Sequence, residues 1–344
     1  MLDHLEGLTD DVGVFQHAIG DIPNRAYGYC LDDVGRALIV GCAVATEREH
    51  AAFATRLLRA CLAFVADAQL SDGWFHGFMG YDRRWQDARA TPDAVGRALW
   101  GLGVVEAEAP RISWRRVARE LRVRAVATVP ELRYLRSYAY AALGLVRSLA
   151  AAPPDAVAVR AALAACAEPI ADGFEAASGP GWAWCEDVMT YDNGRLPEAL
   201  LRAGAALEDE RLVRTGLAML EFLADATLED GLFVPVGNRG WYPRGGPKAR
   251  EGQQPLEAAA MVDAALAALA VTGEPRWRTV ADAAYGWFLG RNAARVVLAR
   301  DGGCCDGIDG SAANPNMGAE STLAYLASAI AMGRLGAASL RILG

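Results

Sequence analysis

One pattern recurs along this chain at a spacing that few folds can accommodate. Six polar clusters each run directly into a segment rich in Ala, Gly and Leu, and their marker residues are Asp32, Asp93, Ser137, Asn193, Gln254 and Asn316. The markers are 61, 44, 56, 61 and 62 residues apart, so each interval has room for one more helix and two loops. Self-similarity of this kind indicates a fold that uses one helical unit repeatedly.

The segments between the polar starts have a different pattern. They carry charged residues on one helical face and apolar residues on the other, which is typical of surface helices, and they lie near 47–69, 111–128, 155–174, 207–226 and 274–290. The six marked helices are apolar nearly all round, so we expect them to be buried, and their small residues suit close packing. This alternation predicts an all-α, single-domain (α/α)6 toroid over residues 1–344. The sixth outer place would go to the N-terminal segment or to the last helix.

Composition agrees with a large helical core and excludes some partners. Hydrophobic residues make up 53 % of the 344 residues. The net charge is −8, and because phosphate binding needs clustered Lys and Arg, we expect no nucleic acid or anionic membrane partner. We also expect no membrane span and no signal segment. Seven cysteines, an odd number partly placed in apolar helices, favour a reducing compartment, so we expect a cytoplasmic protein.

In a toroid the starts of the six inner helices converge at one end and face a shared funnel. One Ser, Thr, Asp or Asn suffices to cap a helix, whereas these starts carry whole clusters of carboxylates, amides and aromatic rings. Such groups suit sugars, whose hydroxyls bind carboxylates and amides and whose C–H faces stack on Trp and Tyr. The residues that we expect to bind substrate are Asn24, Arg25, Tyr27, Asp33, Trp74, His76, Tyr81, Asp82, Trp184, Asp187, Tyr191, Asn193, Asn238, Trp241, Gln253, Gln254 and Asn316.

Glycoside cleavage needs two carboxyl groups that flank the bond, one of them kept protonated by burial or by a like-charged neighbour. The candidates, in order of preference, are Glu186, Asp192, Asp32, Glu320, Asp93 and Glu257. Glu186 and Asp192 stand in the stretch with the densest mix of polar and aromatic residues. Carboxylates that face each other across a wide funnel leave room for water, which favours inversion. Each carboxylate can alternatively be a helix cap or the ion-pair partner of an arginine.

Other chemistries have less support in the sequence. No glycine-rich phosphate loop follows a strand, and adjacent Cys304 and Cys305 are awkward ligands for tetrahedral zinc. The stretch LDDVG lacks the full acidic motifs of terpene cyclases. We therefore expect no metal and no cofactor. Toroid sugar epimerases depend on histidine pairs, and none of the four histidines starts a marked helix, which disfavours epimerase chemistry.

Four stretches carry a resemblance to a known family: WCEDVMTYDNGRLPEALLRAG, DGLFVPVGNRGW, QQPLEAAAMVDA and NMGAESTLAYL. They resemble six-hairpin glycosidase-like bacterial proteins, which are often described only as glycosyltransferase-like. The resemblance spans roughly residues 20–335, and it implies the toroid fold, carbohydrate chemistry and a functional association with glycosyltransferases. We expect a glycoside hydrolase acting on an oligosaccharide or a small molecule. The alternatives are a lyase, an epimerase or a terpene-type cyclase, and a carbohydrate-binding partner of a glycosyltransferase.

Overall fold

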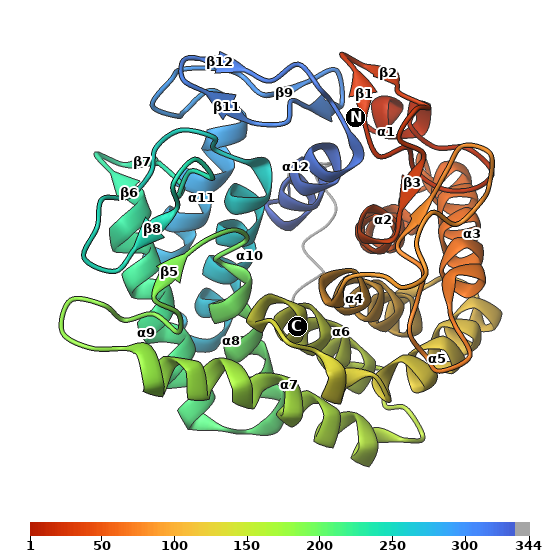
Figure 1. The fold of residues 1–344 in the computed structure, drawn as a ribbon, viewed down its shortest axis with the longest axis horizontal. Helices are drawn as coiled ribbons and strands as arrows, with labels where there is room; N and C mark the ends of the chain where they lie inside the picture. The colour runs from red at the N-terminus through yellow and green to blue at the C-terminus, as the bar shows by residue number, and fades with distance from the viewer. Residues whose placement is uncertain (334–344) are drawn as a thin grey trace.

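The computed structural model describes residues 1–333, in which helices alternate between an inner and an outer ring (Figure 1). The inner helices are α2 (Leu31–Val44), α4 (Pro92–Glu108), α6 (Leu135–Ala150), α8 (Arg195–Leu207), α10 (Pro255–Thr272) and α12 (Ala319–Ala331). The outer helices are α3 (Ala51–Ala68), α5 (Ile112–Val126), α7 (Ala156–Ala177), α9 (Glu210–Thr227) and α11 (Arg276–Phe288). Each inner helix packs against the next, and α12 packs against α2. This closed arrangement confirms the predicted (α/α)6 toroid.

The sixth outer position lies beside α12. The short helix α1 (Asp3–Gly7) packs against α12, and the His4 ring nitrogen Nε2 lies 2.7 Å from the carbonyl oxygen of Met317, just before α12. Of the two possibilities that the sequence left open, the N-terminal segment therefore takes this position among the described residues.

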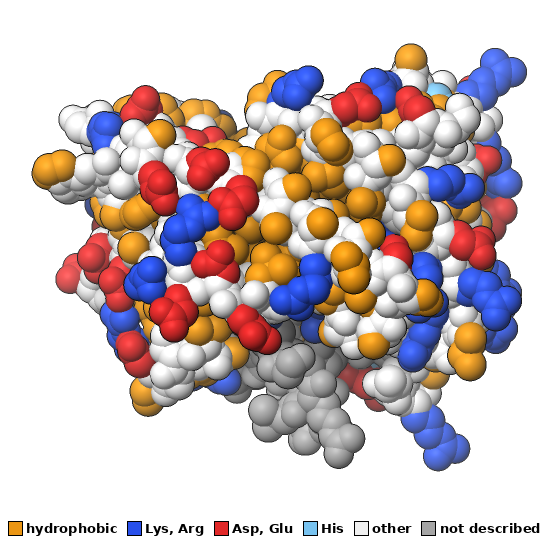
Figure 2. Space-filling model, turned by 90° about the horizontal axis from the view of Figure 1, so that it is seen from below, with side chains coloured by type: hydrophobic (Ala, Val, Ile, Leu, Met, Phe, Trp, Pro, Cys, Tyr) orange, Lys and Arg blue, Asp and Glu red, His pale blue; other side chains and the backbone are white. Residues whose placement is uncertain are grey.

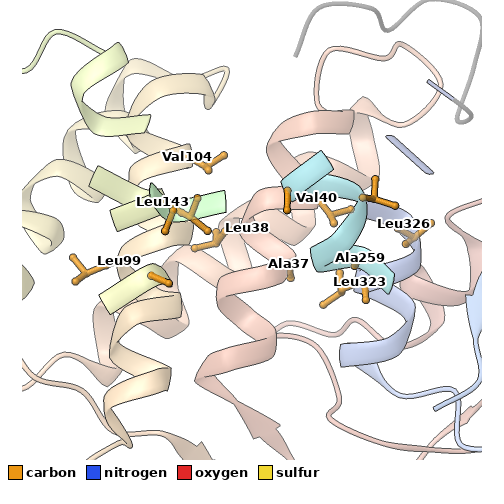
Figure 3. Packing of buried hydrophobic residues seen from close by; sticks show 14 of the residues in the cluster. Ala37, Leu38, Val40, Leu99, Val104, Leu143, Ala259, Leu323 and Leu326 are labelled. Atoms are coloured by element: carbon orange, nitrogen blue, oxygen red, sulfur yellow. The ribbon is translucent and has the colours of Figure 1, made fainter. Parts of the chain in front are cut away.

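The core lies where the inner helices meet each other and the outer ring. Figure 3 shows part of it, in which α2 packs between α4 and α6 on one side and α10 and α12 on the other. The labelled side chains, all buried, are Ala37, Leu38, Val40, Leu99, Val104, Leu143, Ala259, Leu323 and Leu326. Helix α10 is long and apolar enough to cross a membrane by length and composition, yet 72 % of that 18-residue window is buried inside the ring. Its apolar character is therefore accounted for by its place in the core.

Glycines set the distance between α4 and α6. A Cβ atom on Gly103 would lie 2.0 Å from the carbonyl oxygen of Gly144, and one on Gly144 would lie 2.2 Å from the carbonyl oxygen of Leu99. Both separations are far below van der Waals contact, so neither position accepts a side chain without moving a helix. The small residues noted in the sequence are needed for this close approach.

Short antiparallel hairpins stiffen the loops at the near end of the ring in Figure 1. Within one loop, β1 (Ala18–Ile19) pairs with β2 (Ile22–Pro23), β6 (Leu228–Glu229) with β7 (Leu232–Phe233), β9 (Ala299–Arg300) with β10 (Gly303–Cys304), and β11 (Ile308–Asp309) with β12 (Ala312–Ala313). Between distant loops, β3 (Tyr29–Cys30) pairs with β4 (Phe78–Met79), and β5 (Val188–Met189) with β8 (Tyr242–Pro243). The Asp230-Gly231 and Asp301-Gly302 turns have positive φ at both residues, as two-residue hairpin turns require.

The solvent-facing surfaces of outer helices α5 and α7 include exposed apolar residues as well as the charged residues that the sequence pattern predicts. Figure 2 shows the side of the ring on which α7 lies, where hydrophobic side chains spread between basic groups at the right and acidic groups at the left. Val157 at the start of α7 is 85 % exposed, and Ile112 at the start of α5 is 77 % exposed. These residues face solvent because their helices present other apolar residues to the core.

Candidate active site

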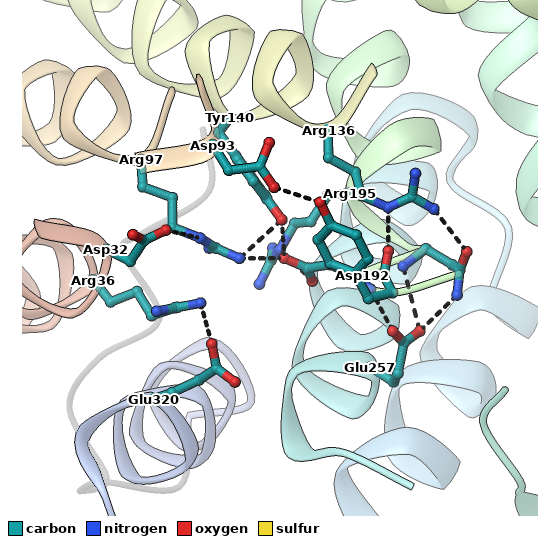
Figure 4. A network of polar contacts seen from close by, with 12 residues as sticks. Asp32, Arg36, Asp93, Arg97, Arg136, Tyr140, Asp192, Arg195, Glu257 and Glu320 are labelled. Atoms are coloured by element: carbon teal, nitrogen blue, oxygen red, sulfur yellow. Dashed lines mark hydrogen bonds and ion pairs between the residues drawn. The ribbon is translucent and has the colours of Figure 1, made fainter. Parts of the chain in front are cut away.

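The first turns of the inner helices meet at one end of the ring and form a polar network (Figure 4). On α2 and α4, an Asp and an Arg four residues later lie on the same helical face, so each helix presents one acid and one base. The network also draws residues from the other inner helices and from the segment before α8. Its labelled members are Asp32, Arg36, Asp93, Arg97, Arg136, Tyr140, Asp192, Arg195, Glu257 and Glu320.

Asp192 is the buried centre of this network. It is 1 % exposed, and its Oδ2 accepts hydrogen bonds from Arg97 Nη2 at 2.6 Å and from the Tyr140 hydroxyl at 2.7 Å. Arg195 Nε lies 3.6 Å from the other carboxylate oxygen. Burial raises the pKa of Asp192, but the charges of Arg97 and Arg195 outweigh it and hold the pKa below its ordinary value. Asp192 is therefore a buried, charged carboxylate that holds the guanidinium groups of Arg97 and Arg195 in place.

Glu257, in the first turn of α10, fixes the segment before α8 through hydrogen bonds. Its carboxylate accepts hydrogen bonds from the backbone N–H of Asp192, from the backbone N–H of Asn193 at 3.3 Å and from Asn193 Nδ2 at 3.0 Å. It is 5 % exposed. Burial, followed by the charge of Asp192, raises the pKa of Glu257 to about 8. The predicted residues Asn193 and Glu257 are thus brought together, as supports of the site wall.

A second set of contacts connects the starts of α4 and α6 to the segment before α8. It involves Asp93 on α4 and Glu186 and Tyr191 in that segment. The Tyr191 hydroxyl donates to Asp93 Oδ2 at 2.5 Å, and Ser137 Oγ donates to Asp93 Oδ1. Arg136 donates from Nη1 to Glu186 Oε2 at 2.8 Å, and its guanidinium lies over the Tyr191 ring at 4.7 Å. Both oxygens of Asp93 are therefore occupied, and Glu186, whose side chain is 31 % exposed, is tied to Arg136.

A hollow of about 210 Å³, here called the inner cavity, opens beside α2 and α12. Asp32 and Glu320 both line it, with side chains 26 % and 37 % exposed. Burial raises the pKa of Asp32; Arg36 and Arg97 oppose this, and the charges of Asp93 and Glu320 add to it, so the pKa stays above its ordinary value. Arg36 Nη2 donates to Glu320 Oε2 at 2.5 Å. The inner cavity thus brings together a carboxyl group with raised pKa and a carboxylate paired with arginine.

His17 is a cavity residue that the sequence analysis did not predict. It lines the inner cavity, and its ring nitrogen Nδ1 lies 3.1 Å from Asn316 Nδ2. The same amide donates to Asp306 Oδ2 at 3.3 Å, and Ser321 Oγ donates to Asp306 Oδ1 at 2.5 Å. His17 lies upstream of the first repeat and reaches the cavity because the β1–β2 hairpin packs beside the loop before α12. No local sequence signal marks that contact.

Two predicted aromatic residues lie away from the funnel. Trp74 is 4 % exposed and its indole N–H donates to the Ala90 carbonyl at 2.9 Å, while Trp184 is fully buried. Both follow short turns that direct the indole into the core, so their neighbouring Gly and Asp residues do not imply exposure. Trp241, by contrast, is partly buried and lies 6.5 Å from the Tyr191 ring, centroid to centroid.

The remaining predicted residues divide between the cavities and the rim. Asp33, Gln253 and Gln254 line cavities, with Asp33 tied to Arg36 and Gln253 Oε1 accepting from the Trp287 indole. Asn238 lines a second cavity described below. Asn24 is half-buried in a rim loop. The residues with exposed side chains in the rim loops are Arg25, Tyr27, Tyr81, Asp82 and Asp187, and the Arg25 guanidinium lies over the Tyr81 ring. His76 stacks on Trp85 and hydrogen-bonds the Asp87 carbonyl.

No metal cluster is found in the part of the chain that the structure describes, where no three His, Cys, Asp or Glu residues are grouped as ligands. No family model and no curated protein matches the chain.

Solved structures match along almost the whole chain. A sugar epimerase from a ruminal bacterium is 11 % identical, with a TM-score of 0.74 over 97 % of this chain and 96 % of that one. The cellobiose 2-epimerase of Spirochaeta thermophila is 12 % identical, with a TM-score of 0.73 over 97 % and 93 %. The GH76 α-mannanase of Bacteroides thetaiotaomicron is 10 % identical, with a TM-score of 0.65 over 97 % and 92 %. These matches show that the chain has the (α/α)6 toroid fold of six-hairpin enzymes, a fold shared by sugar epimerases and glycosidases.

Proposed function

We propose that this protein is a carbohydrate-active enzyme that hydrolyses a glycosidic bond in the inner cavity. The observation that carries the proposal is the contrast between Asp32 and Glu320. Asp32 has a raised pKa and is partly exposed. Glu320 accepts a hydrogen bond from Arg36 on Oε2, while its Oε1 has no hydrogen bond to the described residues. Two carboxyl groups in different electrostatic environments are the requirement for splitting acid and base roles.

In this mechanism Asp32 is the general acid. It donates its proton to the glycosidic oxygen as the bond to the anomeric carbon breaks. Glu320 accepts a proton from a water molecule whose oxygen attacks the opposite face of that carbon, so the anomeric configuration inverts. Arg97, 3.5 Å from Asp32, and Arg36 position the two carboxyl groups. The sequence ranked Glu186 and Asp192 first as catalytic carboxylates. We assign the roles to Asp32 and Glu320 instead, because Asp192 is buried against two arginines.

Epimerisation or isomerisation of a sugar is the second candidate. Sugar epimerases and a D-mannose isomerase are among the structural neighbours, and His17 in the inner cavity could take or return a proton at a sugar carbon. Against it, the other three histidines have places elsewhere: His4 bonds Met317, His50 lies by Glu47, and His76 stacks on Trp85. No histidine pair faces the cavity among the described residues.

The test is a panel of aryl glycosides and gluco- and manno-oligosaccharides incubated in D2O, with products followed by NMR. Hydrolysis would give a free reducing end of inverted configuration and no deuterium on carbon. Asp32→Asn and Glu320→Gln should each lower the rate about 10²–10⁴-fold, whereas Glu210→Gln on the exposed side of α9 should leave it unchanged. Deuterium incorporated at a sugar carbon without bond cleavage would instead establish the epimerase candidate.

A further inference from the structure

A second hollow, here called the outer cavity, adjoins the inner cavity at the funnel rim. It has a volume of about 270 Å³ and lies between the loop before β8, the start of α10 and the β11–β12 hairpin. Gln254 and Asp306 line both cavities, so the two hollows lie side by side and meet at these residues. A ligand in the inner cavity that extends past these two residues would enter the outer one.

The outer cavity presents unoccupied amide groups. The side chains of Asn238 and Gln254 have no hydrogen-bond partner among the described residues. Asn314 accepts a hydrogen bond from the Asn316 backbone through Oδ1, which leaves its Nδ2 group available. Amides both donate and accept hydrogen bonds, as sugar hydroxyl groups do. Three such groups around one hollow match a hydroxyl-rich ligand better than an apolar one.

The charges around the two cavities select against anions. Besides Asp32, which the proposed mechanism keeps protonated, four carboxyl groups and two guanidinium groups line the cavities, which leaves a formal excess of two negative charges. The carboxyl groups are Asp33, Asp306, Asp309 and Glu320, and the guanidinium groups are Arg36 and Arg239. The charge of Arg239 is already paired, because its Nη2 lies 3.1 Å from Asp309 Oδ1. A uronate or a phosphorylated sugar would therefore meet like charge with no unpaired cation to offset it.

We propose that the outer cavity binds a second, uncharged sugar unit, so that the substrate is a neutral oligosaccharide of at least two units. The inference rests on the proposed carbohydrate function and extends it. Asn238, Gln254 and Asn314 hold the hydroxyl groups of the second unit, while the first unit lies beside Asp32 and Glu320.

The experiment compares ligand length in a protein that binds without turnover. Calorimetric titration of the Asp32→Asn protein uses glucose, mannose and their neutral di- and trisaccharides. A disaccharide of the accepted sugar should bind about tenfold more tightly than the monosaccharide, which corresponds to one or two added hydrogen bonds. Adding Asn238→Trp, which fills the outer cavity, or Asn238→Ala should remove this tenfold gain and leave monosaccharide affinity unchanged. Ser311→Ala, at the β11–β12 tip outside both cavities, is the matched control.

The outcomes separate the two proposals. Equal affinity for one and two units, or equal loss of both in the Asn238 variants, would overturn the outer-cavity assignment while leaving the proposed function standing. A uronate-ended disaccharide that binds as tightly as its neutral counterpart would overturn the selection for neutral sugars. Absence of binding by every sugar, with the protein folded, would overturn the proposed function and this inference together.

Discussion

Glu257 at the start of α10 accepts a hydrogen bond from the backbone N–H of Asp192, which precedes α8 with a φ of 50°. A non-glycine residue seldom adopts this left-handed conformation. Here it directs the Asp192 carboxylate toward Arg97 and Tyr140 while the backbone N–H points at Glu257. The polar cluster before α8 therefore connects α8 to three other inner helices, α4, α6 and α10. This explains why the cluster contains more than a single capping residue.

The pKa of Glu257 makes stability depend on pH. The folded protein keeps a proton on this carboxyl group up to a pH of about 8, whereas the unfolded chain loses it near the ordinary value of 4.5. Between these values the folded state binds the extra proton, so the free energy of unfolding should fall as pH rises, by up to about 1.4 kcal/mol per pH unit from this group. Glu257→Gln should remove that contribution.

Urea unfolding of wild type and Glu257→Gln at pH 5, 6, 7 and 8 measures the difference in slope. Glu221→Gln on α9 is a control for loss of a carboxylate that is half exposed. Identical slopes for wild type and Glu257→Gln would show that Glu257 is ionised in the folded protein throughout this range.

Loss of the Asp192 charge should be costly. Asp192→Asn leaves Arg97 and Arg195 buried with less compensation, and breaking a buried ion pair typically costs about 3–5 kcal/mol. The free energy of unfolding, measured by urea titration at pH 7, should fall by that amount, against little change for the exposed Asp225→Asn. If Arg97→Met alone lowers the free energy of unfolding as much as the double substitution Asp192→Asn with Arg97→Met does, the coupling of Asp192 with Arg97 is confirmed.

Local sequence patterns predicted the inner helices and their polar starts, but not which of the carboxylates are open to the cavity. Asp32 and Asp93 are recognisable as equivalent because each precedes an Arg by four residues at the start of an apolar helix, and the structure places both in one network. Helical periodicity is a local property, so it predicted the rings. Which carboxylate is open to the cavity depends on contacts between distant segments, such as Glu257 with Asp192 and Arg36 with Glu320. The same holds for the indole of Trp184, whose burial follows from the fold of its loop and not from its neighbours in sequence.

The contact of α4 with α6 gives a prediction about packing. Gly144→Ala places a methyl group 2.2 Å from the Leu99 carbonyl oxygen, so the helices must separate. The gain in helix propensity, about 1 kcal/mol, should be outweighed, because overpacking costs about 1–3 kcal/mol or more and here meets backbone atoms. Gly7→Ala in α1, where nothing lies within 4 Å, should be neutral or slightly stabilising. Thermal unfolding of the two variants distinguishes them, and a Gly144→Ala protein as stable as Gly7→Ala would contradict the rigid contact.

Arg36 should control the pH dependence of catalysis if Asp32 is the general acid. A general acid must be protonated, so kcat/KM should fall as pH rises through the pKa of Asp32. The positive charge of Arg36 lowers that pKa, although burial keeps it raised overall. Arg36→Gln removes the charge and should move the alkaline limb of the pH–rate profile to higher pH, whereas Arg36→Lys keeps a charge there and should leave the limb near its wild-type position. Because both variants disturb the hydrogen bond to Glu320, a common fall in rate reports that bond, and only the position of the limb reports Asp32. A limb that moves to lower pH in Arg36→Gln would assign the titrating acid to a group other than Asp32.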